Sequence, residues 1–481
     1  MTIFTVLLSI IFILNFILAG FIIFLERRDV GATWAWLLVL LFLPVIGFFL
    51  YLFFGQNLRR RKIFEWKDEE KIGIDKITNY QIQLLRDSSF HFNDYRTTEY
   101  KDLIYMLLVN EGAVLTQDNA VEIFVDGKAK FDALLKDIAE AEDHVHLIYY
   151  IIRNDALGQR VRDALVKKAK EGVKVKLLYD AMGSRRLSKR FFKELIEAGG
   201  EVSVFFPAKV PLFNSKINFR NHRKLAIIDG KIGYIGGFNI GDEYLGLDEK
   251  FGYWRDTHLK VKGKAVYAMQ TRFILDWNQA STQKINYDKR YFPEMRFPGV
   301  TDMQIVSSGP DSEWEQIKYG YIKMINSAKK YIYIQTPYFI PDDSLLDALK
   351  IAALSGIDVR LMIPNKPDHM FVYWATFSHV GELLKTGAKV YIYENGFIHA
   401  KALIVDGKIA TVGTANIDVR SFKLNFEVNA FLYGREIAGQ LEEIFHEDML
   451  YSRELTLRIY QERPLYIRFK ESISRLLSPI L

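Results

Sequence analysis

The sequence contains no cysteine among its 481 residues. Disulfide bonds, cysteine-based zinc sites and catalysis by a thiol are therefore excluded. It also lacks a phosphate-binding P-loop, because each Gly-Lys pair is followed by Ala or Ile rather than by Ser or Thr. The formal net charge is only +6. That charge fits an anionic substrate or surface, but it does not distinguish lipid from nucleic acid.

The N-terminal segment lacks the basic start and the small-residue cleavage site of a signal peptide. Instead, residues 3–25 and 33–54 form two apolar runs, each long enough to cross a bilayer. Tryptophan and tyrosine residues near the ends of the second run resemble interfacial anchors. We therefore expect a transmembrane hairpin over residues 1–58, with Pro44 as a tolerated kink. The alternative is a buried hairpin of a soluble protein.

Basic residues suggest how this hairpin is oriented. Four of them, residues 59–62, directly follow the second run, whereas the break between the runs contains two, Arg27 and Arg28. Cytoplasmic flanks carry the excess of positive charge. We therefore expect a multi-pass protein of the cell membrane with its catalytic part on the cytoplasmic side.

The rest of the chain repeats one order of strands and helices. Strands alternating with helices favour an α/β sheet in each half, and a period of about 180 residues is too long for a solenoid. We expect a linker and entry segment at 59–118, duplicated domains at 119–295 and 296–460, and an amphipathic C-terminal helix at 461–481. The pattern predicts strands at 144–152, 172–179, 201–206, 331–335, 356–363 and 388–393, and helices at 161–170, 191–198, 344–354 and 380–385.

Two further segments have open interpretations. Phe469, Ile473 and Leu476 recur at helical spacing with basic residues between them. This pattern is typical of an interfacial helix, and a helix docked on the domain fits equally well. Apolar and basic residues are interspersed along residues 207–219, which fits either a loop that touches lipid or an ordinary surface loop.

One motif occurs twice with identical spacing. If it forms a strand, a turn and a second strand, its His and Lys lie on the same side of the first strand. Its Asp-Gly pair favours the turn, and its Asn returns to the site. The first copy comprises His222, Lys224, Asp229, Gly236 and Asn239, and the second comprises His399, Lys401, Asp406, Gly413 and Asn416.

Two imidazoles, two ammonium groups and two carboxamides suit a phosphodiester. Lys and Asn donors neutralise the non-bridging oxygens, while one His attacks phosphorus and the other transfers protons. We expect no cofactor and no metal, because a lysine beside each His repels a cation. His144 and His146 form a more metal-like pair, but they lie in an apolar run without a third ligand.

A nucleophilic His needs a partner for its other ring nitrogen. Asp256 and Glu427, downstream of the two motifs at the start of strand-like runs, are predicted to orient the histidines; solvated strand-end acids are the alternative. We count both motif aspartates as catalytic, although their Asp-Gly context fits a turn better. The predicted catalytic residues are His222, Lys224, Asp229, His399, Lys401 and Asp406, and the predicted phosphate-binding residues are Lys224, Asn239, Lys401 and Asn416.

The doubled His-x-Lys-x4-Asp motif resembles that of the phospholipase D superfamily, and the chain is most similar to bacterial cardiolipin synthases. The resemblance implies two phospholipase D-like α/β/α sandwich domains with pseudo-two-fold symmetry behind the hairpin. It implies that two phosphatidylglycerol molecules give cardiolipin and glycerol, with His222 as nucleophile and His399 as acid and base. It also supports Asp256 and Glu427 as orienting acids. The similar segments are residues 33–38, 220–224, 411–422, 425–429 and 475–481.

Three other functions compete with this interpretation. A membrane phospholipase D would have the same catalytic residues and would use water as the acceptor. A nuclease of the superfamily is disfavoured by the apolar N-terminus and the lack of a strong basic patch. A non-catalytic membrane scaffold is disfavoured by two complete motifs. The Asp-Gly-x2-Ala-Arg pattern of CDP-alcohol phosphotransferases is absent. The expected partners are therefore phosphatidylglycerol, cardiolipin and the bilayer, without nucleic acid.

Overall fold

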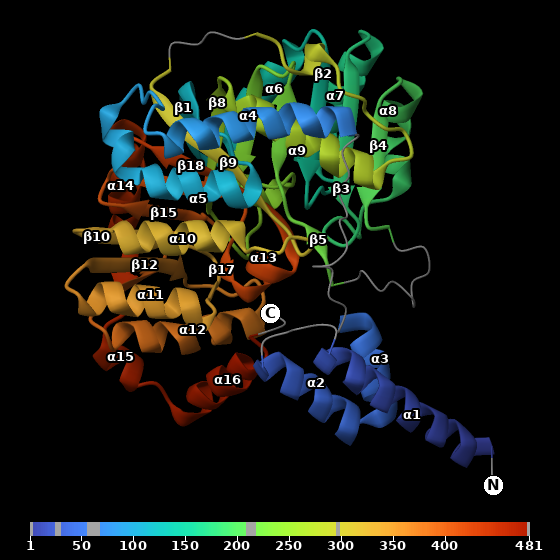
Figure 1. Cartoon of the computed structure of the whole chain (residues 1–481), viewed down its shortest axis with the longest axis vertical. Coiled ribbons are helices and arrows are strands. Elements are labelled where there is room, and N and C mark those ends of the chain that lie inside the picture. Colours follow the sequence, from blue (N-terminus) through green and yellow to red (C-terminus); the bar gives the residue numbers. More distant parts are fainter. Residues whose placement is uncertain (1–2, 25–29, 55–67, 208–217, 295–298, 479–481) are drawn as a thin grey trace.

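The computed structural model describes residues 3–24, 30–54, 68–207, 218–294 and 299–478 (Figure 1). Part of the predicted linker and most of the segment 207–219, which the sequence left open between a lipid-contacting loop and an ordinary surface loop, lie outside these residues. The described chain forms two α/β halves stacked along the longest axis, with a group of apolar helices at one end (Figure 1).

The first half contains a mixed sheet with the strand order β1-β8-β7-β6-β2-β3-β4. The strands β2, β3 and β4 run parallel to one another, and the remaining neighbours are antiparallel. The strands are β1 (Thr116–Asp126), β2 (His144–Tyr149), β3 (Lys174–Asp180), β4 (Glu201–Phe205), β6 (Leu225–Ile228), β7 (Ile232–Gly236) and β8 (Trp254–Lys262).

The second half repeats this sheet in the order β9-β18-β16-β15-β10-β12-β13, with β19 added at the edge. Pairing of β1 with β9 joins the two sheets. The predicted duplicated α/β architecture is thereby confirmed. The strands are β9 (Thr301–Ser308), β10 (Tyr331–Gln335), β12 (Asp358–Pro364), β13 (Lys389–Tyr393), β15 (Ala402–Val405), β16 (Ile409–Gly413), β18 (Asn425–Tyr433) and β19 (Ser452–Glu454).

Helices cover both faces of each sheet and enclose three apolar cores. The helices α6, α7 and α8 pack on the outer face of the first sheet, and α5, α10, α11 and α12 pack on that of the second. Between the sheets, α9 and α14 share one continuous core. These helices are α5 (Lys101–Glu111), α6 (Gly127–Ala139), α7 (Ala156–Lys170), α8 (Lys193–Glu197), α9 (Ala265–Ala280), α10 (Gln316–Ser327), α11 (Asp343–Leu354), α12 (Met370–Leu384) and α14 (Arg435–Leu450).

The entry segment is part of the second core rather than a plain linker. Its helix α4 (Asp68–Arg86) contributes Leu85, and α5 contributes Leu103 and Leu107, all buried against the second half. The described chain after the N-terminal helices also contains α13 (Val419–Lys423), α15 (Leu457–Gln461) and α16 (Leu465–Leu476), together with short 3₁₀ helices at Tyr95–Tyr100, Lys189–Phe192, Asp242–Leu245 and Lys289–Tyr291.

Two predicted helices begin earlier than the pattern suggested. The helix α7 begins at Ala156 because the Asp155 side chain accepts a hydrogen bond from the Gly158 N–H and caps it. The helix predicted at 380–385 is the end of α12, which begins at Met370 without a side-chain cap. Its first turns are rich in aromatic residues, so they lack both a cap signal and a polar face.

The prediction for the second apolar run is wrong in one respect. Instead of one span over 33–54, the structure has α2 (Val30–Phe42) and α3 (Pro44–Phe54), which follow α1 (Ile3–Phe24). Proline lacks an N–H and its ring clashes with the preceding turn, so Pro44 begins a new helix. The Asn15 amide of α1 donates to the carbonyls of Leu40 at 3.2 Å and Pro44 at 2.8 Å, close to this break. None of the helices in the described residues is both long and apolar enough to cross a membrane.

Buried Arg223 ties the two halves together and is held by an ion pair inside the first half. The Arg223 Nη1 lies 2.8 Å from both carboxylate oxygens of Asp276, and its Nε donates to the Glu427 carbonyl at 3.1 Å. The same guanidinium donates to the Ser308 carbonyl at 3.2 Å. Because Ser308 and Glu427 belong to the second half, Arg223 connects both sheets around the motif strand.

Replacing Asp276 by Asn should destabilise the protein strongly, because the Arg223 charge would lose its carboxylate while remaining buried. We expect a loss of about 3–5 kcal/mol, measured by denaturant unfolding of the full chain in detergent. The double variant Arg223→Met/Asp276→Leu should recover part of this loss. Equal stability of Asp276→Asn and the wild type would show that Asp276 is not needed to hold the Arg223 charge in the core.

Candidate active site

Each motif forms the β-hairpin that the sequence predicts. In the first half β6 pairs with β7, and in the second half β15 pairs with β16. Both turns begin at the motif aspartate, with φ of 53° at Asp229 and 54° at Asp406, and each is followed by a glycine with positive φ. The Asp-Gly pair therefore serves the turn, since Asp and Gly tolerate this left-handed conformation.

The two motif aspartates contact backbone N–H groups rather than the side chains of His222 and His399, which does not support the catalytic role predicted for them. The Asp229 carboxylate accepts hydrogen bonds from the backbone N–H groups of residues 142–144, at 2.8–2.9 Å. The Asp406 carboxylate accepts from those of residues 329–331, at 2.7–2.9 Å. Each aspartate fixes the turn to the start of the neighbouring strand, and its contribution to the site is structural.

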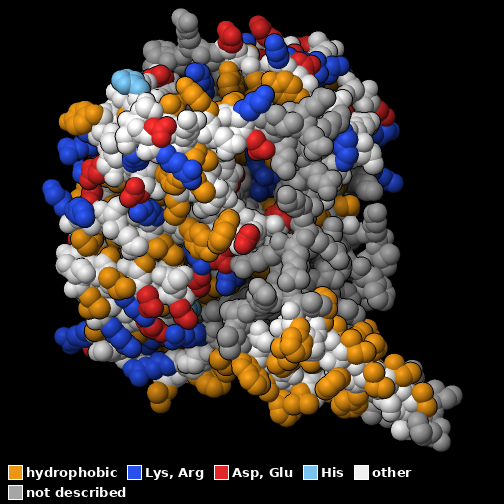
Figure 2. Space-filling view, viewed as in Figure 1, with side chains coloured by type: hydrophobic (Ala, Val, Ile, Leu, Met, Phe, Trp, Pro, Cys, Tyr) orange, Lys and Arg blue, Asp and Glu red, His pale blue; other side chains and the backbone are white. Residues whose placement is uncertain are grey.

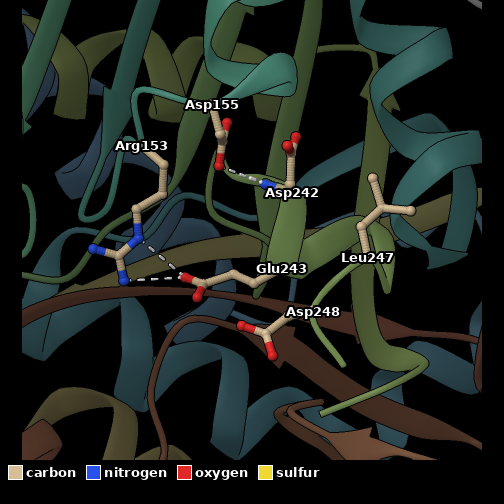
Figure 3. A pocket seen from close by; sticks show the side chains of 6 residues that line it. All are labelled: Arg153, Asp155, Asp242, Glu243, Leu247 and Asp248. Atoms are coloured by element: carbon tan, nitrogen blue, oxygen red, sulfur yellow. Dashed lines mark hydrogen bonds and ion pairs between the residues drawn. The ribbon is translucent and has the colours of Figure 1, made fainter. Parts of the chain in front are cut away.

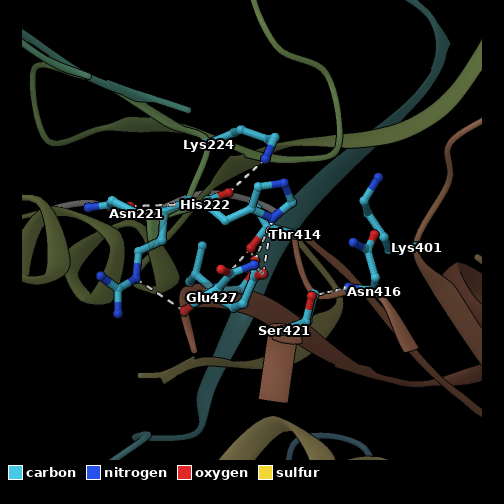
Figure 4. A network of polar contacts seen from close by, with 12 residues as sticks. Asn221, His222, Lys224, Lys401, Thr414, Asn416, Ser421 and Glu427 are labelled. Carbon is cyan, nitrogen blue, oxygen red and sulfur yellow. Dashed lines mark hydrogen bonds and ion pairs between the residues drawn. The ribbon is translucent and has the colours of Figure 1, made fainter. Parts of the chain in front are cut away.

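Each histidine is paired with a carboxylate of the other half. His222 Nδ1 lies 2.9 Å from Glu427 Oε2 (Figure 4), and His399 Nδ1 lies 2.6 Å from Asp256 Oδ2. Both carboxylates are fully buried. The predicted orienting acids thus contact the histidines, in a crosswise arrangement that the sequence did not reveal. Because Nδ1 is engaged in both rings, Nε2 is the nitrogen left for a substrate.

Short strands that cross between the halves produce this arrangement. The strand β5 (Arg220–Asn221), just before the first motif, runs parallel to the start of β18. The strand β14 (Phe397–Ile398), just before the second motif, runs parallel to the start of β8. The backbone N–H of His222 continues the first pairing to the Phe426 carbonyl at 2.9 Å. Each histidine is therefore placed by the strand that carries its partner acid.

The motif lysines are buried beside the histidines. Lys224 Nζ donates to the His222 carbonyl at 2.7 Å, and Lys401 Nζ donates to the His399 carbonyl and lies 2.7 Å from His399 Nδ1. Burial lowers the pKa of Lys224 to about 7 and that of Lys401 to about 8. The carboxylates Asp256 and Glu427 oppose this decrease at both lysines.

The ionisation of the histidines depends on the same two opposing effects, burial and attraction to the carboxylates. Burial lowers the pKa of both His222 and His399 to about 4, against the attraction of their partner carboxylates. Burial alone would raise the pKa of Asp256 and Glu427, but the adjacent Lys and His groups hold both pKa values below their ordinary values. Near neutral pH the site thus combines neutral imidazoles, ionised carboxylates and lysines that have only partly lost their charge. A neutral imidazole can attack, and the cationic lysines attract a phosphodiester.

The two motif asparagines have different surroundings. The Asn239 carboxamide accepts from the Ile151 N–H at 3.1 Å and donates to the Tyr244 hydroxyl at 3.3 Å. The Asn416 Oδ1 is buried and has no hydrogen-bond partner among the described residues. Phosphate binding by these asparagines remains a prediction.

Several residues around the histidines were not predicted from the sequence. The Tyr150 ring lies edge-on to His222 at 4.9 Å, and the Trp254 ring lies 5.2 Å from His399. A Cβ on Gly237 would lie 1.9 Å from Asp256 Oδ1, so glycine is required there for the carboxylate to fit. Tyr150 directly follows the carboxyl end of the parallel strand β2. Ligands of α/β sheets bind at this end of the strands, so the position of Tyr150 could have identified it as a site residue.

A hollow of about 250 Å³ beside the first motif is not the phosphodiester site (Figure 3). Four acidic side chains and one arginine line it, and its arginine, Arg153, is paired with Glu243 at 3.1 Å. The Asp155 carboxylate accepts from the Asp242 N–H at 2.8 Å. These contacts hold the loop after Asn239 in place, and the negative charge of the lining disfavours an anion.

No group of three or more His, Asp or Glu side chains in the described chain is arranged to hold a metal. His144 and His146 both face the Gln270 side chain, at 3.0 Å and 2.9 Å. They are buried core residues.

The fold and the crossed, doubled His-Lys site define an enzyme of the phospholipase D type. The family model described as "Cardiolipin synthase, PLD-like domain" matches residues 134–277 and 321–449, and "Phospholipase_D-nuclease N-terminal" matches residues 13–56. The cardiolipin synthase of Listeria monocytogenes serotype 4b (strain CLIP80459) is 64% identical over 99% of both chains. The major cardiolipin synthase of Bacillus subtilis (strain 168) is 63% identical over 100% of both.

The chain therefore belongs to the cardiolipin synthases of the phospholipase D superfamily, and it is a phosphatidyltransferase. Among solved structures, the phosphatidylserine synthase of Haemophilus influenzae Rd KW20 is similar in fold, with a TM-score of 0.62 and 15% identity. That similarity covers 79% of this chain and 100% of the other.

Removing the charge of Asp256, which contacts His399 from the other half, should affect catalysis far more than stability. Removing the carboxylate of Asp229, which holds a turn, should do the opposite. Asp256→Asn should lower turnover about 10²–10⁴-fold, because the His399 ring loses the group that fixes its proton. Asp229→Ala should lower the free energy of unfolding by about 1–3 kcal/mol, because it leaves three backbone N–H groups without their acceptor.

Turnover of both variants should be measured below the unfolding temperature of the weaker one, and stability by denaturant unfolding. A turnover loss in Asp229→Ala as large as that in Asp256→Asn would contradict the separation of the two roles.

Proposed function

We propose that the enzyme transfers the phosphatidyl group of one phosphatidylglycerol to the glycerol hydroxyl of another, producing cardiolipin and free glycerol. The observation that carries this proposal is the crosswise pairing of His222 with Glu427 and of His399 with Asp256. This pairing builds one site from both halves and leaves Nε2 of each ring for the substrate. One phosphodiester replaces another, so the exchange requires no energy source.

In the first step, His222 Nε2 attacks phosphorus, and the bond from phosphorus to the glycerol oxygen breaks. His399 gives its proton to the departing alkoxide, so that glycerol leaves and phosphatidyl-His222 remains. Glu427 stabilises the positive charge that develops on the attacking ring. Lys224 and Lys401 neutralise the non-bridging oxygens. Substrate binding brings a negative charge beside His399, which favours the protonated form needed here.

In the second step, the primary hydroxyl of another phosphatidylglycerol attacks the same phosphorus. His399 removes its proton, the bond from phosphorus to His222 breaks, and cardiolipin is released. Water in place of this alcohol would give phosphatidic acid. The selectivity for the alcohol therefore depends on whether the lipid acceptor reaches the phosphorus before water does.

The substrates are bilayer lipids, and the N-terminal helices support attachment to a membrane. Their side chains expose large apolar surface, including Phe16 at 81%, Phe24 at 78% and Phe42 at 73% (Figure 2). An apolar patch of this kind marks a membrane or protein contact. We assign these helices to membrane attachment, and the four basic residues at 59–62 favour the cytoplasmic side for the catalytic halves, domains 119–295 and 296–460.

The decisive test supplies the full chain in detergent with phosphatidylglycerol alone, a metal chelator and no nucleotide. Cardiolipin and glycerol should form in equal amounts. His222→Ala and His399→Ala should each lower the rate more than about 10³-fold, whereas His446→Ala, at an exposed histidine of α14, should not change it. Phosphatidic acid as the main product would contradict the transfer reaction and indicate a hydrolase.

The order of the histidines can be tested with phosphatidylglycerol that carries a labelled phosphate. His399→Ala should form a labelled adduct slowly, because it lacks the acid of the first step, and should retain it, because it also lacks the base of the second. The adduct should be stable in base and labile in acid, and His222→Ala should form none. The reverse result would assign the attack to His399.

The lysine pKa values predict the alkaline side of the pH profile. Because burial lowers the pKa of Lys224 to about 7 and that of Lys401 to about 8, raising the pH removes the charge that attracts the phosphodiester. kcat/KM, which reports the free enzyme, should therefore fall between about pH 7 and pH 9. Lys224→Arg keeps its charge over this range and should shift the decline to higher pH. A wild-type kcat/KM that stays flat up to pH 9.5 would contradict this account.

A further inference from the structure

The C-terminal helix α16 is attached to the protein by its polar side. Glu471 and Ser474 are its buried residues, with exposed fractions of 4% and 2%. Arg463, just before the helix, binds the Glu471 carboxylate at 2.6 Å, and Arg475 pairs with Glu382 of α12 at 2.5 Å. The helix packs along α12. Its position is thus fixed by ion pairs rather than by apolar burial.

The outward side of α16 is apolar, the reverse of an ordinary surface helix. Leu465, Phe469 and Leu476 are 81%, 67% and 76% exposed, and Ile473 lies between them at 43%. Their spacing of three and four residues places them on one side of the helix. No apolar contact compensates for this exposure, so the face needs an apolar partner outside the described chain.

The exposed charges of α16 are all positive. Arg468 and Lys470 are exposed, and Arg475 is exposed beside its partner Glu382, while the one acidic residue of the helix, Glu471, is buried in its ion pair. Basic side chains beside an apolar face favour a surface that is apolar in depth and anionic at its boundary. An anionic bilayer has both properties, whereas a second copy of this helix would bring like charges together.

The position of α16 agrees with this partner. In Figure 1, α16 lies at the same end of the longest axis as the apolar helices α1, α2 and α3. Figure 2 shows apolar side chains over that end. A bilayer that receives the N-terminal helices therefore approaches the end of the molecule that carries α16.

We propose that α16 is a second membrane contact, which lies in the headgroup boundary of an anionic bilayer and fixes the orientation of the catalytic halves on it. This proposal extends the membrane attachment inferred above, and it does not depend on the reaction mechanism. The N-terminal helices hold the chain at the membrane, and α16 prevents the catalytic halves from turning freely.

The absence of cysteine allows a direct test, because one introduced thiol can be labelled selectively. Full-length Phe469→Cys and Lys193→Cys, the latter at an exposed position of α8, are labelled with an environment-sensitive fluorophore. Each is reconstituted in vesicles of phosphatidylglycerol and phosphatidylcholine. The label at 469 should shift to the blue and be quenched by nitroxide lipids, whereas the label at 193 should be quenched by aqueous iodide.

Equal quenching of both labels by iodide would overturn the proposal. A blue shift at 469 that depends on protein concentration in detergent, without nitroxide-lipid quenching in vesicles, would assign the face to a second copy of the chain. Both readouts are independent of turnover, so they separate a failure of this proposal from a failure of the proposed reaction.

A pair of charge variants tests the consequence for activity. Phe469→Glu should lower turnover of phosphatidylglycerol in vesicles about tenfold, which corresponds to losing the burial of one large apolar side chain. It should not change turnover in detergent micelles. Ile196→Glu adds the same charge at an exposed apolar position of α8, at the other end of the molecule (Figure 1), and should have a much smaller effect. Equal losses in vesicles and micelles for Phe469→Glu would assign α16 a structural role and overturn the membrane contact.

Discussion

The arrangement of the active site depends on one constraint, namely that each histidine takes its orienting carboxylate from the opposite half of the chain. A carboxylate can hold an imidazole only when the two groups are fixed in direct contact. Here that contact requires β5 to run beside β18 and β14 to run beside β8. Neither half-site is complete alone, so the shared core around α9 and α14 serves the chemistry as well as stability.

Burial gives this arrangement its electrostatic character. Two lysines and two carboxylates taken out of water would each be costly alone, but together they form a nearly balanced set. With neutral histidines the two lysines and two carboxylates cancel, and burial lowers the pKa of both lysines. An incoming phosphodiester adds a negative charge, which favours the charged form of both lysines.

Periodicity and spacing were sufficient to predict the duplicated α/β sheets and the motif hairpins, and they identified the histidines, lysines and orienting acids that the structure brings together. They were not sufficient to reveal the crossing, because the pairing of β5 with β18 joins residues far apart in the sequence through only two residue pairs. The turn role of Asp229 was visible in its Asp-Gly context, whereas its three amide partners depend on tertiary structure. The break at Pro44 could have been predicted, since proline disrupts a helix interior. The burial of Glu471 could not have been predicted, because a single acidic residue in a basic, apolar segment is expected to be exposed.

Duplication gives two equivalent half-sites, but the reaction needs two histidines with different roles. The differences between the halves are small and specific. Glu427 approaches His222 with both carboxylate oxygens, at 2.9 Å and 3.0 Å, and the lysine of that half contacts only the backbone of the motif. Near His399, the lysine ammonium also lies 2.7 Å from the ring nitrogen. Burial has the largest effect on the pKa of both rings. The next largest effect is attraction from Glu427 on His222 and repulsion from Lys401 on His399. A ring that must carry a phosphoryl group and its positive charge is better served by the first environment, and a ring that must release its proton is better served by the second.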